Sequence, residues 1–136
     1  MYDIPLLLHR IVHQMDRAAD RVLREELDIS HRRAIVLLVV ESEGPLNQRE
    51  LASRLGHTEP AISAMMRELA DRGLVRFESA SGRERQVLVT DEGRRLVVAS
   101  RLLLGPMFDD VIRRTGVDDD ELGAQLHRLA TGLGVA

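Results

Sequence analysis

The chain of 136 residues contains no cysteine, no tryptophan and no lysine. Without cysteine, a disulfide scaffold, a thiolate zinc site, a catalytic thiol and a cysteine-based redox sensor are all excluded. Every basic side chain apart from histidine is an arginine, which suits bidentate contacts to carboxylate or phosphate groups. A biased genome composition would produce the same absence of lysine, so this feature alone does not assign a ligand.

Aromatic side chains and long apolar runs are also scarce. Tyr2, Phe77 and Phe108 are the only aromatic residues, so the core has to be built from Leu, Val, Ile, Ala and Met, which favours packed helices. The apolar run at residues 34–40 is far too short to span a membrane. Asp3 stands where a signal peptide would carry positive charge. We therefore expect a single-domain cytoplasmic protein without a membrane partner.

Motifs for catalysis are missing as well. The sequence has no glycine-rich phosphate loop, no nucleophile elbow and no paired-carboxylate motif. We expect no enzyme activity, no catalytic residue and no cofactor.

Apolar periodicity predicts six helices and one short β-hairpin. From Ile4 to Val22 the apolar positions recur at spacings of four and three, which is typical of a helix that packs along another helix. Ser30 is a suitable N-cap for a second helix that extends to about Glu41. The run at residues 34–40 is apolar on all sides, so this helix is expected to be central.

Two short helices follow, joined by a tight turn. Asn47 and Glu50 have the spacing of a capping box, and Gly56 ends this helix after two turns. Thr58 then caps the next helix, in which Pro60 is tolerated in the first turn. The pattern predicts a helix-turn-helix.

The second of these helices has one apolar and one polar face. At 100° per residue the apolar side chains fall together, namely Ile62, Met65, Met66 and Leu69. The other face carries Pro60, Ser63, Ala64, Arg67 and Asp71. It is small near its N-terminus, as a helix that enters the DNA major groove requires. An ordinary surface helix with a polar outer face would show the same pattern.

Residues 75–90 predict a strand, a polar turn and a second strand. Arg76, Arg83 and Arg85 surround the tip, and a helix-turn-helix followed by a basic hairpin is a winged helix. Arginine at such a tip can reach the electronegative minor groove. Solubility, and ion pairing with Glu78 and Glu84, are the competing explanations for these arginines.

The segment ELASRLGHTEPAISAMMRELADRGLVRFESASGRERQVLVTDEGRRL resembles the DNA-binding lobe of the multiple-antibiotic-resistance regulators, the MarR family of winged-helix repressors. The resemblance runs over the whole chain, and its most specific parts are Leu51-Ala52, Leu69, residues 72–75, residues 89–90 and Gly93. It implies a mainly helical fold with a small β-hairpin wing, in which residues 30–93 form the winged helix-turn-helix lobe. Residues 1–28 and 94–136 would be dimerisation helices, and the whole chain, 1–136, would be a single MarR-type domain. It also implies a homodimer that reads a near-palindromic operator on double-stranded DNA.

The sequence departs from the family at two positions. Ser81 stands where the wing of the family carries an aspartate, two residues before the arginine that Arg83 matches. Ala64 stands where the recognition helix of the family often has an arginine, and Arg67 follows one turn later. Sequence preference therefore cannot be carried over from relatives.

We predict the following division of the DNA contacts. Gln48 and Arg49, at a helix N-terminus, would hold phosphate. The recognition helix would face bases or adjacent phosphates, and the wing would supply two arginines. The residues assigned to these two parts are Thr58, Pro60, Ser63, Ala64, Arg67, Arg83 and Arg85.

The C-terminal region supports a dimer by itself. The long helix that Thr90 caps carries more apolar residues than one stripe of a small lobe requires. A further capping box, from Asp118 to Glu121, precedes leucines at heptad spacing, among them Leu126 and Leu129.

Neither the acidic run at residues 118–121 nor the histidines predict a metal site. Adjacent carboxylates at a helix start point in different directions, and the helix dipole already favours negative charge there. His9 and His13 are four residues apart on one helix, but no third ligand is evident.

Members of this family commonly release DNA when a small, often aromatic or phenolic anion binds where the dimer arms meet the lobes. The resemblance therefore implies a repressor that responds to a small molecule, and Arg10, His13 and Arg17 are the candidate effector-binding residues. The competing hypothesis is a helical module that binds protein through its winged lobe. It is supported by charge, because residues 44–95 hold nine arginines against eight acidic residues, a balance of only +1.

Overall fold

The computed structural model describes residues 1–80 and 84–135. It contains two compact units, Met1–Leu103 and Leu104–Ala136. Among the described residues, no helix is both long and apolar enough to cross a membrane.

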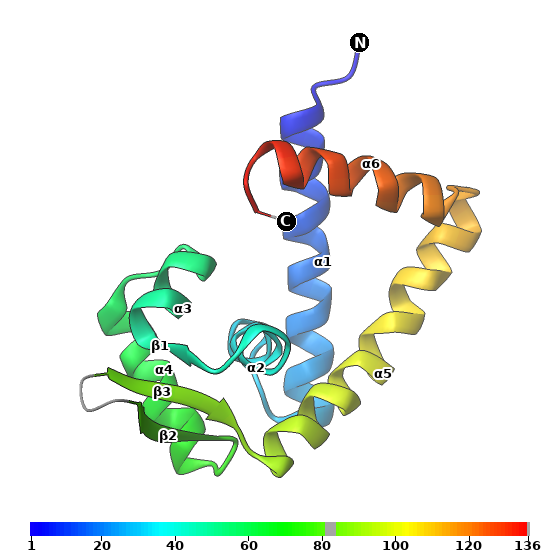
Figure 1. The fold of residues 1–136 in the computed structure, drawn as a ribbon. Helices are drawn as coiled ribbons and strands as arrows, with labels where there is room; N and C mark the ends of the chain where they lie inside the picture. Colours follow the sequence, from blue (N-terminus) through cyan, green and yellow to red (C-terminus); the bar gives the residue numbers. More distant parts are fainter. Residues whose placement is uncertain (81–83, 136) are drawn as a thin grey trace. The chain divides into compact units, whose positions relative to one another are not determined.

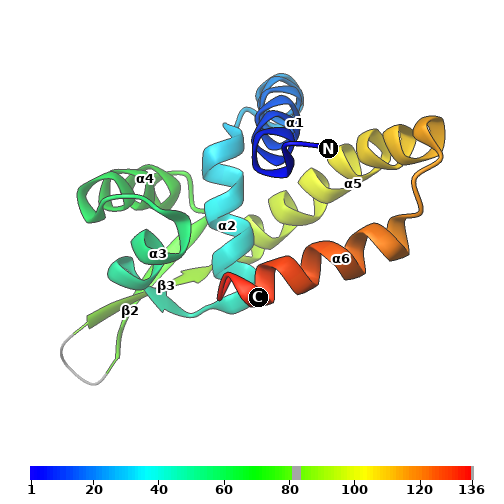
Figure 2. The same ribbon diagram turned by 90° about the horizontal axis from the view of Figure 1, so that it is seen from above.

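The first unit begins with two helices whose ends are set by local hydrogen bonds. Helix α1 spans Ile4–Leu27 and is capped by the Asp3 carboxylate, which accepts from the Leu6 amide. Helix α2 spans His31–Glu43, and the Ser30 hydroxyl accepts from the Arg33 amide as its N-cap, as predicted. Helix α2 contacts α1, α3 and strand β3, which confirms its expected central place (Figures 1 and 2).

The remaining elements of the first unit form the lobe. They are β1 (Leu46–Asn47), α3 (Gln48–Leu55), α4 (Glu59–Asp71), β2 (Val75–Ala80) and β3 (Glu84–Val89), followed by the first turns of α5 (Asp91–Thr115). The three strands form one antiparallel sheet in the order β1-β3-β2. The winged helix expected from the sequence is confirmed, with a third strand, β1, in addition to the expected hairpin.

The register of the sheet places its apolar residues on the core. Val87 pairs with Leu46 on one side and with Phe77 on the other, and Val75 pairs with Val89. Val87, Leu46, Val75 and Val89 are buried. Side chains of α2, α3 and α4 complete this core, and the largest fully buried ones include Leu37, Leu51, Ile62, Met66 and Leu69.

The wing joins α5 through a close backbone approach. The Thr90 hydroxyl donates to the Gly73 carbonyl at 2.6 Å and accepts from the Gly93 amide at 3.1 Å, so it caps α5 and ties it to the end of α4. Gly93 itself lies against the chain before β2, where a Cβ atom would stand 2.2 Å from the Leu74 carbonyl oxygen. Only glycine fits at this position.

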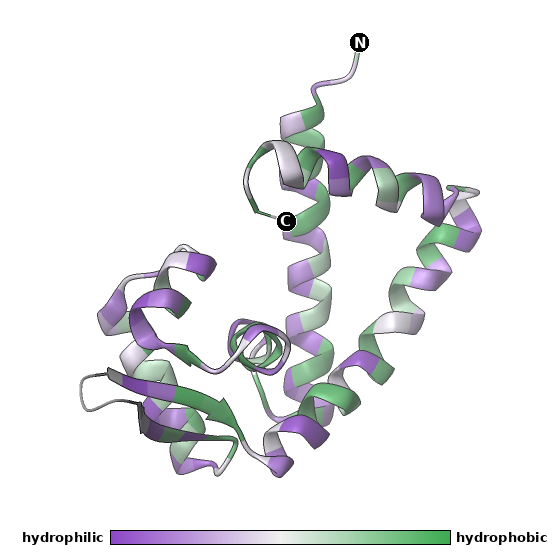
Figure 3. Cartoon of the chain, in the orientation of Figure 1, coloured by the Kyte–Doolittle hydropathy of each residue, from purple (hydrophilic) through white to green (hydrophobic). Residues whose placement is uncertain are grey.

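Large apolar side chains remain exposed in both units. The N-terminal half of α1 exposes seven of them, at 36–53% of their surface, and its hydropathy is shown in Figure 3. In the second unit, α6 (Asp119–Gly132) has no buried residue, and it exposes Leu126 and Leu129. Asp118 caps α6 by accepting from the Glu121 amide at 2.9 Å.

Candidate nucleic-acid interface

The helix-turn-helix is held in place by the caps that the sequence predicts. The Asn47 side chain accepts from the Glu50 amide at 2.8 Å, and the Glu50 carboxylate accepts from the Asn47 amide at 3.3 Å. Gly56 ends α3 in the left-handed region, with φ of 64°. The Thr58 hydroxyl then accepts from the Ala61 amide at 3.3 Å and starts α4. These bonds fix where the outward face of α4 begins.

The two faces of α4 are arranged as its periodicity predicts. Ile62, Met66 and Leu69 are fully buried and Met65 is nearly so. Pro60, Ala64 and Arg67 are exposed and Ser63 is half-buried. Arg67 has no hydrogen bond or ion pair with any residue that the structure describes, so its guanidinium is available to an outside partner.

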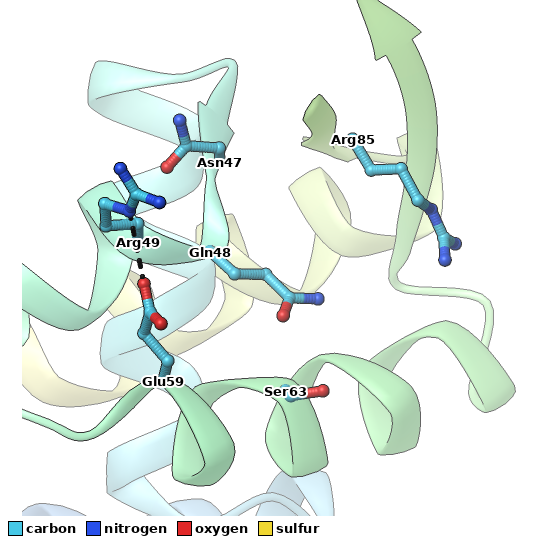
Figure 4. Close-up of a pocket in the computed structure, with 6 residues that line it drawn as sticks. All are labelled: Asn47, Gln48, Arg49, Glu59, Ser63 and Arg85. Carbon is cyan, nitrogen blue, oxygen red and sulfur yellow. Dashed lines mark ion pairs between the residues drawn. The ribbon is translucent and has the colours of Figure 1, made fainter. Parts of the chain in front are cut away.

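A cleft of about 410 Å³ lies beside this face. Helix α3 and the residue before it contribute Asn47, Gln48 and Arg49, helix α4 contributes Glu59 and Ser63, and strand β3 contributes Arg85 (Figure 4). Four residues that the sequence assigns to DNA, Gln48, Arg49, Ser63 and Arg85, therefore line one cleft.

Both arginines of the cleft have a partner within the chain. The Arg49 Nε atom, in the first turn of α3, lies 3.4 Å from the Glu59 carboxylate at the start of α4. The Arg85 guanidinium lies 4.3 Å from the centre of the Phe77 ring, in a cation–π contact between the two wing strands. The two contacts restrain the arginine side chains that line the cleft.

The wing arginines differ from one another. Arg76 forms an ion pair with Glu78, which agrees with the competing explanation that the wing arginines pair with nearby acidic residues. Arg85 stacks on Phe77. Arg83 and Ser81, which carry the sequence predictions for the wing tip, lie outside the described residues.

Sequence reasoning missed two residues of the cleft, Asn47 and Glu59. Asn47 was interpreted only as a helix cap, a role that the structure confirms. Glu59 is the first residue of α4, where the helix dipole favours an acidic side chain. This local explanation gave no reason to assign Glu59 a second role. A signal was available in the spacing, because Glu59 and Ser63 are one turn apart and share a side of α4.

A second cleft, of about 450 Å³, lies between the middle of α1 and the start of α2. Its lining is largely charged and consists of His13, Asp16, Arg17, Asp20, Arg21, His31 and Arg32. His13 and Arg17, two of the three candidate effector-binding residues, line this cleft. Arg10 is exposed on α1 and does not line it.

Hydrogen bonds across this cleft connect α1 to α2. The Asp20 carboxylate accepts from the His31 amide at 2.9 Å, and the Asp16 carboxylate lies 3.0 Å from His31 Nε2. The bond from the His31 amide, together with the one from Arg24, lowers the pKa of Asp20. Nδ1 of His31 is buried and has no hydrogen-bond partner among the described residues.

Within the described part of the chain, no group of three or more histidine, aspartate or glutamate side chains is placed to hold a metal ion.

Comparison with known proteins places the lobe in a family. Residues 27–86 match the family model described as the MarR family. No curated protein matches the chain. The resemblance seen in the sequence is confirmed, because a solved transcriptional regulator of the MarR family has the same fold as this chain over nearly its whole length.

Three solved structures illustrate the likeness. A MarR-family transcriptional regulator from Rhodococcus sp. RHA1 is 25% identical, with a TM-score of 0.82, over 95% of this chain and 92% of that chain. CouR from Rhodococcus jostii RHA1, bound to p-coumaroyl-CoA, is 26% identical, with a TM-score of 0.79, over 95% and 90% of the two chains. The MepR–DNA complex from Staphylococcus aureus is 22% identical, with a TM-score of 0.75, over 98% and 99%, and it supports the fold alone.

Proposed function

Because residues 27–86 match the family model described as the MarR family, we propose that this chain is a homodimeric, sequence-specific DNA-binding transcriptional regulator that acts in the cytoplasm and has no enzyme activity. The observation that carries the proposal is the shared cleft beside α4. It gathers Gln48, Arg49, Ser63 and Arg85 from α3, α4 and β3 next to a small, exposed recognition face. This is the arrangement by which a winged helix contacts both base edges and backbone.

The proposed contacts divide between backbone and bases. Gln48 and Arg49, in the first turn of α3, contact phosphate through amides and side chains. Arg85 contacts the backbone beside the wing, and Arg83 keeps its sequence-based role there. Helix α4 and its N-cap enter the major groove with Thr58, Pro60, Ser63, Ala64 and Arg67.

The proposed dimer follows from the exposed apolar side chains of α1, α5 and α6. Apolar side chains exposed in this number mark an interaction site. In a symmetric pair of chains, the same helices of both protomers would cover one another, with residues 1–28 and 94–136 as the dimerisation helices. Two lobes related by a two-fold axis read a near-palindromic operator.

The proposed regulation is repression that a small molecule relieves. The cleft between α1 and α2 holds His13 and Arg17, and Arg10 lies on the same helix. An aromatic or anionic effector fits this lining, in which three arginines outnumber two aspartates. The likeness to CouR bound to p-coumaroyl-CoA supports a small-molecule partner. A ligand acts on DNA binding only through its different affinity for the two states, so DNA and effector have to weaken each other's binding by the same factor.

The competing function is a protein-binding module, which the near-neutral lobe favours. A titration of mixed-sequence duplex DNA, followed by fluorescence anisotropy at several salt concentrations, separates the two. A DNA-binding regulator gives a dissociation constant of roughly 10⁻⁴–10⁻⁶ M at physiological salt, and its affinity falls as salt rises.

Two variants show whether the cleft is the part of the protein that binds DNA. Arg85→Ala should weaken binding and lower the slope of log affinity against log salt by about one for each phosphate that Arg85 neutralises. Arg101→Ala removes the same charge from α5, where Arg101 pairs with Glu41 on α2, and should leave the slope unchanged. Binding that is absent, or that responds equally to both variants, contradicts the proposal.

A further inference from the structure

An acidic side chain lies among the residues proposed to face DNA. Glu59 is the first residue of α4 and lines the cleft with Arg49, Ser63 and Arg85 (Figure 4). Its side chain is 59% exposed. A carboxylate at a DNA interface is repelled by every phosphate nearby, so it reduces affinity for all sequences unless a donor group on the DNA offsets this cost.

The simplest role for Glu59 is to stabilise the turn between α3 and α4 through its ion pair with Arg49. The geometry of that ion pair shows that this role does not fully explain an acid at this position. The Glu59–Arg49 distance is 3.4 Å, and the Arg49 side chain is 78% exposed. Exposed pairs of this kind contribute little to stability. The end of α3 and the start of α4 at this turn are already fixed by Gly56 and Thr58.

The position of Glu59 points to a base edge. In a helix-turn-helix, the residues at the N-terminal end of the recognition helix contact bases in the major groove. Pro60 and Ala64 are small and allow the start of α4 to approach the groove closely. In the major groove, the usual partner of a carboxylate is the N4 amino group of cytosine. Guanine N7 and O6 and thymine O4 are acceptors that repel it, and adenine presents its N6 donor beside the N7 acceptor.

We propose that Glu59 is a specificity-determining residue that accepts a hydrogen bond from the N4 amino group of a cytosine in each half-site. This inference rests on the proposed function as a DNA-binding regulator. Arg49, 3.4 Å away in the free protein, orients the carboxylate and turns to phosphate on binding. Glu59 thus selects sequence partly by repulsion, because guanine and thymine at this position present only acceptors to its charge.

The substitution Glu59→Gln changes one acceptor-only group into a group that both donates and accepts. Glutamine makes its paired hydrogen bonds with adenine N6 and N7, so the preferred base at this position should change from cytosine to adenine. Glu59→Ala removes the contact and should leave the position without preference. Both variants should bind mixed-sequence DNA more tightly than the parent, since they no longer carry a charge that phosphate repels.

The test is selection of bound duplexes from a random library by the full chain and its variants, followed by titration of the selected site with its cytosine replaced. For the parent chain, the replacement should weaken binding about 5- to 150-fold. For Glu59→Ala it should have little effect. Glu92→Gln is the matched control, because Glu92 forms a similarly exposed ion pair with Arg95 on α5, away from the cleft.

The outcomes separate this inference from the proposed function. If the parent selects a defined site and both Glu59 variants select the same site with the same base at every position, Glu59 does not read DNA and the inference is wrong, while the proposed function stands. If the parent selects no site, both this inference and the proposed function are wrong. Arg49→Gln gives an independent check, because a phosphate contact should weaken all sites equally and leave the selected sequence unchanged.

Discussion

Removal of the exposed leucines of α6 should dissociate the protein and unfold it. Leu126 and Leu129 are 41% and 50% exposed, yet they occupy heptad positions of an amphipathic helix with no buried residue of its own. Helices of this kind are stable only when a partner covers their apolar face. We therefore expect an obligate homodimer, in which the double substitution Leu126→Ala and Leu129→Ala acts on both copies of the interface.

The magnitude follows from the exposed surface. The two side chains together expose about nine-tenths of the surface of one leucine in each protomer. Full burial of a leucine contributes about 1.5–3 kcal/mol, and alanine retains part of that area. Counted over two protomers, the double variant should lose about 2–5 kcal/mol of dimer stability, which raises the dissociation constant about 30- to several-thousand-fold.

Sedimentation equilibrium and thermal melting at several protein concentrations measure this effect. The parent should be a dimer at low micromolar concentration, with a melting temperature that rises with concentration. Leu55→Ala, in α3 of the lobe, is the control that should lower stability without changing the dimer dissociation constant. A parent chain that stays folded as a monomer at low micromolar concentration would refute the reasoning.

Three further predictions concern the lobe and its link to α1. Arg67→Ala should change the sequence of DNA selected from a random library, because a base contact contributes about 1–3 kcal/mol of discrimination; an unchanged profile would place Arg67 on phosphate or away from DNA. Gly93→Ala should lower the free energy of unfolding, measured by urea denaturation, by about 1–3 kcal/mol or more, since its Cβ would meet the Leu74 carbonyl oxygen. An unfolding free energy equal to the parent's would show that the wing and α5 can move apart without loss of stability. Asp20 has a pKa lowered by its bonds to His31 and Arg24, so its stabilising contribution is present at neutral pH and is lost as pH falls through its lowered pKa. The stability difference between the parent and Asp20→Asn should therefore shrink in acid, and a difference independent of pH would exclude this contribution.

Much of the fold could be predicted because its boundaries are set locally. Ser30, Asn47 with Glu50, Thr58 and Asp118 each cap a helix through a bond to an amide three residues ahead, and such spacing is visible in the sequence. The burial of Ile62, Met66 and Leu69 followed from helical periodicity in the same way.

Features that depend on distant partners could not be predicted. Strand β1 has two residues, too few for an alternating pattern, and exists because Leu46 pairs with Val87. The bond between Asp20 and the His31 amide, and the stacking of Arg85 on Phe77, join residues that periodicity does not relate. Glu59 was overlooked for a different reason, since an acid at the start of a helix already has a local explanation.

Selection of bound duplexes from a random library by the full chain tests the central claim most directly. A homodimer with two recognition helices should enrich one near-palindromic site, whose half-sites lie about one helical turn apart, and should bind it about 10³-fold or more tightly than mixed-sequence DNA at physiological salt. The recovery of no common sequence, with equal affinity for the selected and the starting DNA, would contradict the assignment of this chain as a sequence-specific regulator.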